Sequence, residues 1–144
     1  MSTLLIVYHT RTGGSRQMAE AVAQAAREHG PVVIRTAEQA EPEDLLGAGG
    51  YLFCAPENLA AISGVMKDFF DRCYYPVLGR IEGRPYALMV CAGSDGENAV
   101  RQIARLCART GRFADLLDAN ERELELLDSE GPQLTLLVRS ADLA

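Results

Sequence analysis

The stretch LLIVYHTRTGGSR, residues 4–16, decides how the rest of this chain folds. Its first five residues form an unbroken apolar run, which is typical of a strand buried on both faces within a parallel sheet. Residues 10–15 then gather three hydroxyl groups and two glycines, and an amphipathic pattern over residues 16–29 predicts a helix. Backbone N–H groups, hydroxyls and the positive end of the helix dipole converge in such a turn, so the stretch favours the binding of a phosphate.

The spacing of this turn excludes several well-known phosphate loops. It lacks both the Gly-x-x-x-x-Gly-Lys-Ser/Thr pattern of nucleoside-triphosphate sites and the Gly-x-Gly-x-x-Gly pattern of dinucleotide sites. A low-molecular-weight phosphatase would open the loop with a cysteine, and a response-regulator receiver would need acidic residues where this chain has Tyr8 and His9. The pattern that remains is Thr-x-Thr-Gly-x-Ser, although a polar glycine turn can also precede a helix without binding a ligand.

The composition is that of an ordinary globular protein. With 144 residues, 48% hydrophobic and 24% charged, the chain is expected to form a single domain over residues 1–144. Its formal charge of −6 argues against nucleic-acid or anionic-membrane binding, since both favour a basic surface. No apolar run is long enough to span a membrane and no secretion signal precedes the first strand, so a cytoplasmic location is expected.

The cysteines do not predict a metal site. Cys54, Cys73, Cys91 and Cys107 are widely spaced, without a Cys-x-x-Cys pair, and the chain has only two histidines. Reduced cysteines packed as small hydrophobic residues are the expected state.

Apolar strands and amphipathic helices alternate along the chain. Further strands are predicted at residues 32–35, 51–54 and 85–91. Further helices are predicted over one or two turns at 42–46, from 64 toward Pro76, and at 98–110. This alternation predicts an α/β fold with a doubly wound parallel sheet. The loops after the first, third and fourth strands, residues 10–15, 55–64 and 92–96, would then lie at one edge of the sheet, where such folds bind ligands.

Residues 4–111 resemble the flavodoxin-like superfamily, and most closely its FMN-dependent NAD(P)H oxidoreductases of the quinone-reductase branch. Two segments carry the resemblance: residues 10–15, and residues 55–71, in which a proline-containing loop leads to Ser-Gly and then to a Lys-x-Phe-x-Asp helix. The resemblance implies a three-layer fold whose five parallel strands are ordered 2-1-3-4-5. It also implies FMN as cofactor, with NAD(P)H as a co-substrate.

The resemblance assigns three groups of cofactor-binding residues and no catalytic side chain. The FMN phosphate would be held by Thr10, Arg11, Thr12, Gly13, Gly14 and Ser15. The isoalloxazine ring would lie along Pro56, Glu57, Asn58 and Leu59, and its pyrimidine side would be closed by Ala92, Gly93, Ser94 and Asp95. The chain has no tryptophan to cover the ring, so one ring face is expected to be open to a hydride donor or a quinone.

The C-terminal segment, residues 112–144, departs from the family pattern. An acidic amphipathic helix is predicted over residues 113–128 and a fifth strand over 134–139, with no long final helix after it. One sheet face would then be partly bare, which predicts a homodimer or a higher oligomer.

The resemblance implies an oxidoreductase that passes electrons from NAD(P)H through FMN to a quinone or similar acceptor. The alternative is a non-catalytic electron-transfer module that serves redox partner proteins. A domain that has lost its flavin and serves only in interactions is a third possibility.

Overall fold

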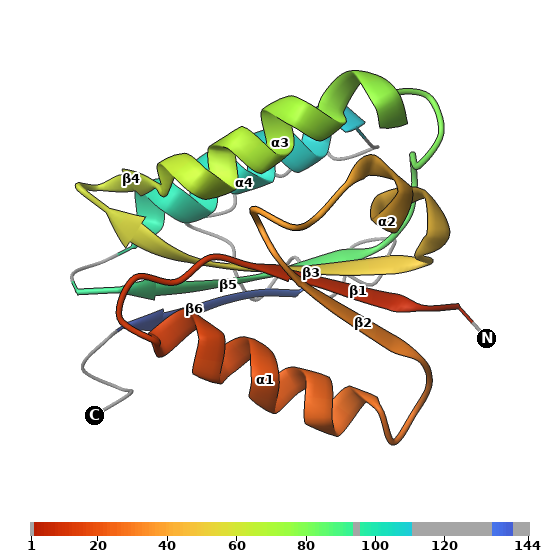
Figure 1. Cartoon of the computed structure of the whole chain (residues 1–144). Helices are drawn as coiled ribbons and strands as arrows, with labels where there is room; N and C mark the ends of the chain where they lie inside the picture. The colour runs from red at the N-terminus through yellow and green to blue at the C-terminus, as the bar shows by residue number, and fades with distance from the viewer. Residues whose placement is uncertain (1, 94–95, 111–133, 140–144) are drawn as a thin grey trace.

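The computed structural model describes residues 2–93, 96–110 and 134–139 of the chain. Helices and strands alternate along it (Figure 1). Their bounds, in chain order, are β1 Leu4–Tyr8, α1 Gly14–Ala26, β2 Val32–Thr36, α2 Pro42–Gly47, β3 Gly50–Asn58, β4 Ala61–Ile62, α3 Gly64–Val77, β5 Tyr86–Ala92, α4 Glu97–Thr110 and β6 Leu134–Arg139.

The described strands form one sheet in the order β2-β1-β3-β5-β6, and all of these neighbours pair in parallel. Counted without the short β4, this is the order predicted from the sequence, and the flavodoxin-like α/β fold is confirmed. The additional strand β4 pairs antiparallel with the far end of β3. Because β2, β1, β3 and β5 are parallel, the loops that follow them leave the sheet at the same edge, on the left in Figure 1.

Helices cover both faces of the sheet. Figure 1 shows α1 on one face and α2, α3 and α4 on the other. The side chains of β1 alternate between the two cores: Leu5 and Val7 belong to the core under α3 and α4, and Ile6 packs with Met18 and Ala19 of α1. All three β1 side chains are fully buried, as the unbroken apolar run predicts.

Several element boundaries differ from the sequence prediction, and two of them bear on the predicted site. Residues 55–58 were expected in a loop, but β3 continues to Asn58 because it pairs with β5 as far as Pro56↔Cys91 and then with β4. Helix α1 begins at Gly14, two residues earlier than predicted, because Gly13 takes the N-cap position. The predicted strand at 134–139 is present as β6, whereas the predicted helix at 113–128 lies outside the described residues.

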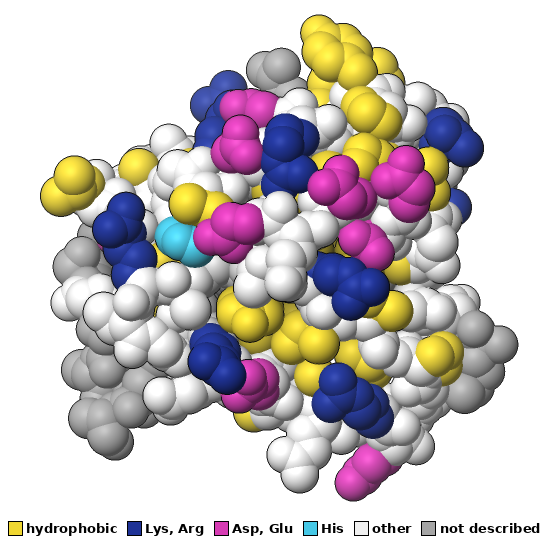
Figure 2. Space-filling view, viewed as in Figure 1, with side chains coloured by type: hydrophobic (Ala, Val, Ile, Leu, Met, Phe, Trp, Pro, Cys, Tyr) yellow, Lys and Arg dark blue, Asp and Glu magenta, His cyan; other side chains and the backbone are white. Residues whose placement is uncertain are grey.

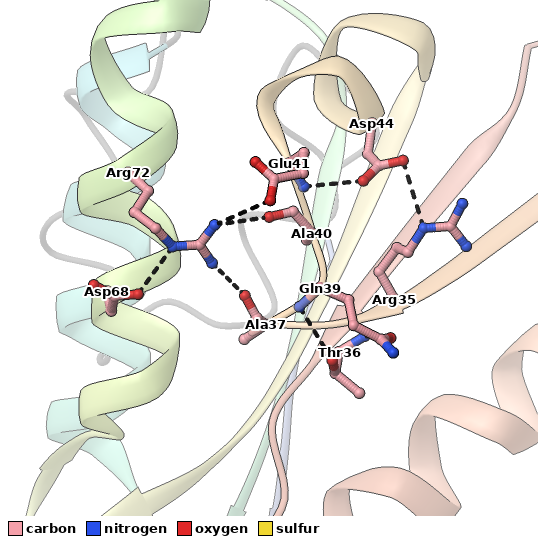
Figure 3. A network of polar contacts seen from close by, with 9 residues as sticks. All are labelled: Arg35, Thr36, Ala37, Gln39, Ala40, Glu41, Asp44, Asp68 and Arg72. Carbon is pink, nitrogen blue, oxygen red and sulfur yellow. Dashed lines mark hydrogen bonds and ion pairs between the residues drawn. The ribbon is translucent and has the colours of Figure 1, made fainter.

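Arg72 of α3 fixes the segment between β2 and α2 (Figure 3). Its guanidinium group donates hydrogen bonds to the carbonyl oxygens of Ala40 at 3.0 Å and Ala37 at 2.5 Å, and its Nε donates to Asp68 at 2.9 Å. The Ala37 N–H in turn donates to the carbonyl oxygen of Tyr8 at 2.7 Å. Arg72 therefore holds the chain after β2 against the end of β1, next to the turn at residues 10–15.

Candidate functional site

The turn between β1 and α1 is preformed by its own hydrogen bonds. The Gly13 N–H donates to the Thr10 hydroxyl at 2.8 Å, and the Gln17 N–H donates to the Gly13 carbonyl oxygen at 3.0 Å. Gly13 has a φ of 101°, a left-handed conformation that favours glycine. No side chain in the described part of the chain caps the N-terminus of α1, so its first amides are available to an anion.

Ser15 gives the clearest indication of which group this turn fits. Its side chain is buried, and its Oγ has no hydrogen-bond partner within the part of the chain that the structure describes. An unsatisfied buried hydroxyl destabilises a protein by roughly 1–3 kcal/mol. A phosphate oxygen at this helix N-terminus would accept the missing hydrogen bond, so the residues present fit a phosphate group.

Two residues of the turn are exposed, and one of them is positively charged. Arg11 and Thr12 are exposed, and Arg11 is the one charged residue within residues 10–15. A positive charge beside the helix N-terminus adds to its attraction for an anion. Arg16, the next basic residue, is instead paired with Glu20 at 2.9 Å along the exposed side of α1.

Cys54 of β3 contacts the turn at its Ser15 end. Its thiol donates a hydrogen bond to the Ser15 carbonyl oxygen, with Sγ and O separated by 3.3 Å. Burial, with a smaller contribution from Cys91, raises the pKa of Cys54 to about 12. The thiol therefore stays protonated at neutral pH and acts as a donor, not as a nucleophile.

His9 connects the same turn to the start of α3. Its ring Nδ1 lies 2.9 Å from the Oγ of Ser63, and its backbone N–H donates to the Cys54 carbonyl oxygen at 3.0 Å. Burial lowers the pKa of His9 below the ordinary value of 6.5; Glu38 opposes this shift, and Arg11 adds a smaller lowering. The contact was not predicted from the sequence, although Ser63 before an apolar helical pattern is a recognisable N-cap signal.

The second group of predicted site residues lies in the hairpin formed by β3 and β4. Glu57 pairs with Ile62, and Asn58 pairs with Ala61, so the turn consists of Leu59 and Ala60. The Leu59 side chain is fully exposed at the tip.

Glu57 and its neighbour Pro56 are half-buried at the base of this hairpin. The Glu57 carboxylate accepts a hydrogen bond from the Ala99 N–H at 3.3 Å, so it faces the first turn of α4. Asn98 and Gln102 of the same helix also bond to the hairpin backbone, a pair of contacts that the sequence did not reveal.

The third group of predicted site residues begins at the last residue of β5. Ala92 is buried as the last residue of that strand, and Gly93 is exposed just beyond it. Ser94 and Asp95 lie outside the described residues. The structure therefore brings residues 10–15, 56–59 and 92–93 to the same edge of the sheet (Figure 1), while their contacts with a cofactor stay a prediction.

The described residues also form a cleft away from the predicted site. A cleft of about 650 Å³ between α3 and α4 has an aromatic lining that includes Tyr51, Phe53, Phe70 and Tyr86, and none of the predicted site residues lines it. The described residues contain no group of three or more His, Cys, Asp or Glu side chains that could hold a metal ion. None of the described helices is both long and apolar enough to cross a bilayer.

Charged side chains of both signs are interspersed over the face shown in Figure 2. On this face the acidic side chains do not form one continuous surface. Several neighbouring charges are paired, as in Lys67 with Asp71 and Arg72 with Asp68. Such exposed pairs contribute little to stability, and they reduce the local excess of one sign.

Comparison with known proteins places residues 1–119 within the model of a family described as NADPH-dependent FMN reductase. The chain is 38% identical over 86 residues to a flavodoxin of Aquifex aeolicus, covering 58% of this chain and 46% of that protein. It is 29% identical over 94 residues to an NAD(P)H dehydrogenase (quinone) of Acidithiobacillus ferrooxidans, covering 50% and 47%. The chain thus spans about half the length of the curated relatives it matches.

Solved structures agree with the fold. The two-electron reduced flavodoxin of Megasphaera elsdenii superposes with a TM-score of 0.69 at 16% identity, covering 95% of this chain and 85% of that one. At this identity the similarity establishes the architecture alone.

Proposed function

This chain belongs to the NADPH-dependent FMN reductase family, and we propose that it uses FMN to pass electrons from NAD(P)H to a quinone or a similar small acceptor. The observation that carries the proposal is the buried Ser15 hydroxyl, which has neither a hydrogen-bond partner nor a side-chain cap beside it among the described residues. A terminal phosphate would accept a hydrogen bond from that hydroxyl, and its binding at a helix N-terminus requires neither a metal ion nor a lysine.

Each residue of the turn has a distinct part in holding the phosphate. Ser15 and the Thr12 hydroxyl would donate hydrogen bonds, with the first amides of α1 beside them. The Thr10 hydroxyl already accepts the Gly13 N–H, so it shapes the loop while keeping its own hydrogen for donation. Arg11 would offset part of the phosphate charge from the exposed side.

The other two loops would hold the ring. Residues 56–59 would lie along the ring and residues 92–95 would close its pyrimidine side; a flat, largely apolar ring system needs such contacts together with a few polar groups. When bound, FMN supplies the redox chemistry, since it accepts a hydride and returns electrons to an acceptor. We assign no acid–base side chain; the chain binds and orients the reactants.

A second candidate function is supported by the similarity to the Aquifex aeolicus flavodoxin. In that case the chain is an electron-transfer module that is reduced and oxidised only by partner proteins. Steady-state oxidation of NADH and NADPH, measured with the purified chain, FMN and a benzoquinone, separates the two functions. The proposed reductase oxidises one of these nucleotides at a rate that depends on the chain, whereas the module gives no rate above that of free FMN.

We also propose that the chain folds as one domain and assembles as a homodimer or a higher oligomer. Among the described helices, α1 alone lies on its face of the sheet (Figure 1). On that face the β5 side chains Ala87, Met89 and Cys91 are only partly buried. Light scattering at micromolar concentration tests this assembly, and a monomeric mass would contradict it.

A further inference from the structure

The turn between β3 and β4 is built from residues that do not favour it. Leu59 has a φ of 50° and Ala60 a φ of 60°, so both adopt the left-handed conformation although neither is glycine. Two-residue hairpin turns with two left-handed residues favour Asn-Gly or Gly-Gly, because a Cβ atom is crowded in this region. Both residues are exposed, and Leu59 completely so, which means that their own side-chain packing does not stabilise the turn.

The hairpin is also too short to hold the turn by itself. Its ladder consists of two residue pairs, Glu57↔Ile62 and Asn58↔Ala61. An isolated two-stranded hairpin is marginal in water even when it is longer than this one. The strained turn therefore needs support from outside the hairpin.

Helix α4 supplies that support on both sides of the turn. The Asn98 amide donates a hydrogen bond to the Ala60 carbonyl oxygen at 2.5 Å, and the Gln102 Oε1 accepts one from the Ile62 N–H at 2.7 Å. Asn98 and Gln102 are four residues apart, so they lie on the same side of the helix. The Ala99 N–H adds a third contact, to the Glu57 carboxylate.

We infer that Asn98 and Gln102 are positioning residues that hold the Leu59–Ala60 turn in its left-handed conformation and thereby fix the hairpin backbone. The part of this inference that concerns a flavin ring beside the hairpin rests on the proposed function. Helix α4 also begins at Glu97, a few residues after Ala92 and Gly93, so it lies next in the chain to the other segment proposed to hold the ring. A hairpin held in this way presents preformed backbone groups and avoids an ordering step when the cofactor binds.

Amide hydrogen exchange on the cofactor-free chain tests this arrangement directly. In the Gln102→Ala variant the Ile62 amide is expected to exchange at least tenfold faster, while the Ile6 amide in the centre of β1 keeps its rate. Gln102→Glu keeps an acceptor oxygen and is expected to preserve the protection of Ile62. Arg101→Ala, at an exposed position on the same helix, is the matched control and should leave both amides unchanged.

Two results would overturn the inference. One is an unchanged Ile62 amide in Gln102→Ala. The other is a uniform acceleration of Ile62 and Ile6 in Gln102→Ala, which would make Gln102 a general stability element.

FMN affinity then tests the link to the cofactor. Asn98→Ala and Gln102→Ala are expected to raise the Kd of FMN about three- to tenfold. The inhibition constant of inorganic phosphate against FMN should stay the same, since the turn at residues 10–15 is untouched. An unchanged Kd of FMN in both variants overturns the positioning role. If the unmodified chain does not bind FMN, the proposed function fails, and the exchange experiment still decides whether α4 holds the hairpin.

Discussion

The Nδ1 atom of His9 lies 2.9 Å from the Oγ of Ser63, and both side chains are buried. Ser63 is the N-cap of α3, and its Oγ already accepts the Met66 N–H at 3.4 Å. The hydroxyl hydrogen is therefore available to Nδ1, and we assign His9 as a neutral ring that carries its proton on Nε2. This contact joins the turn between β1 and α1 to the helix that follows the β3–β4 hairpin.

Removing the Ser63 hydroxyl is expected to destabilise both the start of α3 and the segment around His9. Ser63→Ala deletes the N-cap of α3 and leaves His9 without its partner, so the free energy of unfolding should fall by about 1–3 kcal/mol. Urea denaturation measures the change, with Ser2→Ala at an exposed position as the control. A loss no larger than that of Ser2→Ala would show that the contact is not formed in solution.

His9 should also make stability depend on pH. Because burial lowers the pKa of His9 in the folded chain, the unfolded chain binds more protons between the folded pKa and 6.5. The His9 contribution is therefore complete above pH 6.5 and is lost as the pH falls from 6.5 through the folded pKa.

Urea denaturation at pH 7.5 and 5.5 measures this dependence. His9→Gln should lose less stability between the two pH values than the unmodified chain, and His29→Gln, at an exposed position, should behave like the unmodified chain. An identical pH dependence in His9→Gln and the unmodified chain would contradict the assignment.

Cys54 is expected to resist alkylation in the folded chain. With a pKa of about 12, the thiolate fraction at pH 8 is roughly 10⁻⁴, and the side chain is fully buried. Cys91 is partly exposed, so it should react first with iodoacetamide. Mass spectrometry of proteolytic fragments follows the order of labelling, and early modification of Cys54 would be incompatible with its place beneath the turn.

Glycine at position 60 should relieve the strain of the hairpin turn. Ala60 is exposed and left-handed, so Ala60→Gly is expected to raise the free energy of unfolding by about 1 kcal/mol, after the entropy gained by the unfolded chain is included. Thermal or urea unfolding provides the measurement, with Ala25→Gly in the exposed part of α1 as the opposite control. A destabilised Ala60→Gly would mean that the turn is not left-handed in solution.

The sequence predicts the parts of this fold whose signals are local. The apolar run of β1, the glycine turn, and the helical period of α4 each lie within a short window, and parallel pairing follows from their alternation. The hairpin is different, because Pro56 and Asn58 are poor strand residues. Pro56 joins β3 by pairing with the distant Cys91, and Asn58 pairs with Ala61 across a turn that lacks the usual glycine. The contacts of His9 with Ser63 and of Gln102 with Ile62 span 54 and 40 residues, so they follow from the tertiary fold and not from spacing.

We propose that the turn at residues 10–15 binds the phosphate of FMN through Ser15. Fluorescence titration of FMN with the unmodified chain and with Ser15→Ala measures the contribution of this hydroxyl to binding. The variant should bind FMN about tenfold more weakly or worse, because a hydrogen bond to a charged phosphate is lost. It should unfold with an unchanged or higher free energy, because an unpaired buried hydroxyl has been removed. Equal FMN affinity in both proteins, or no quenching by the unmodified chain, would contradict the account.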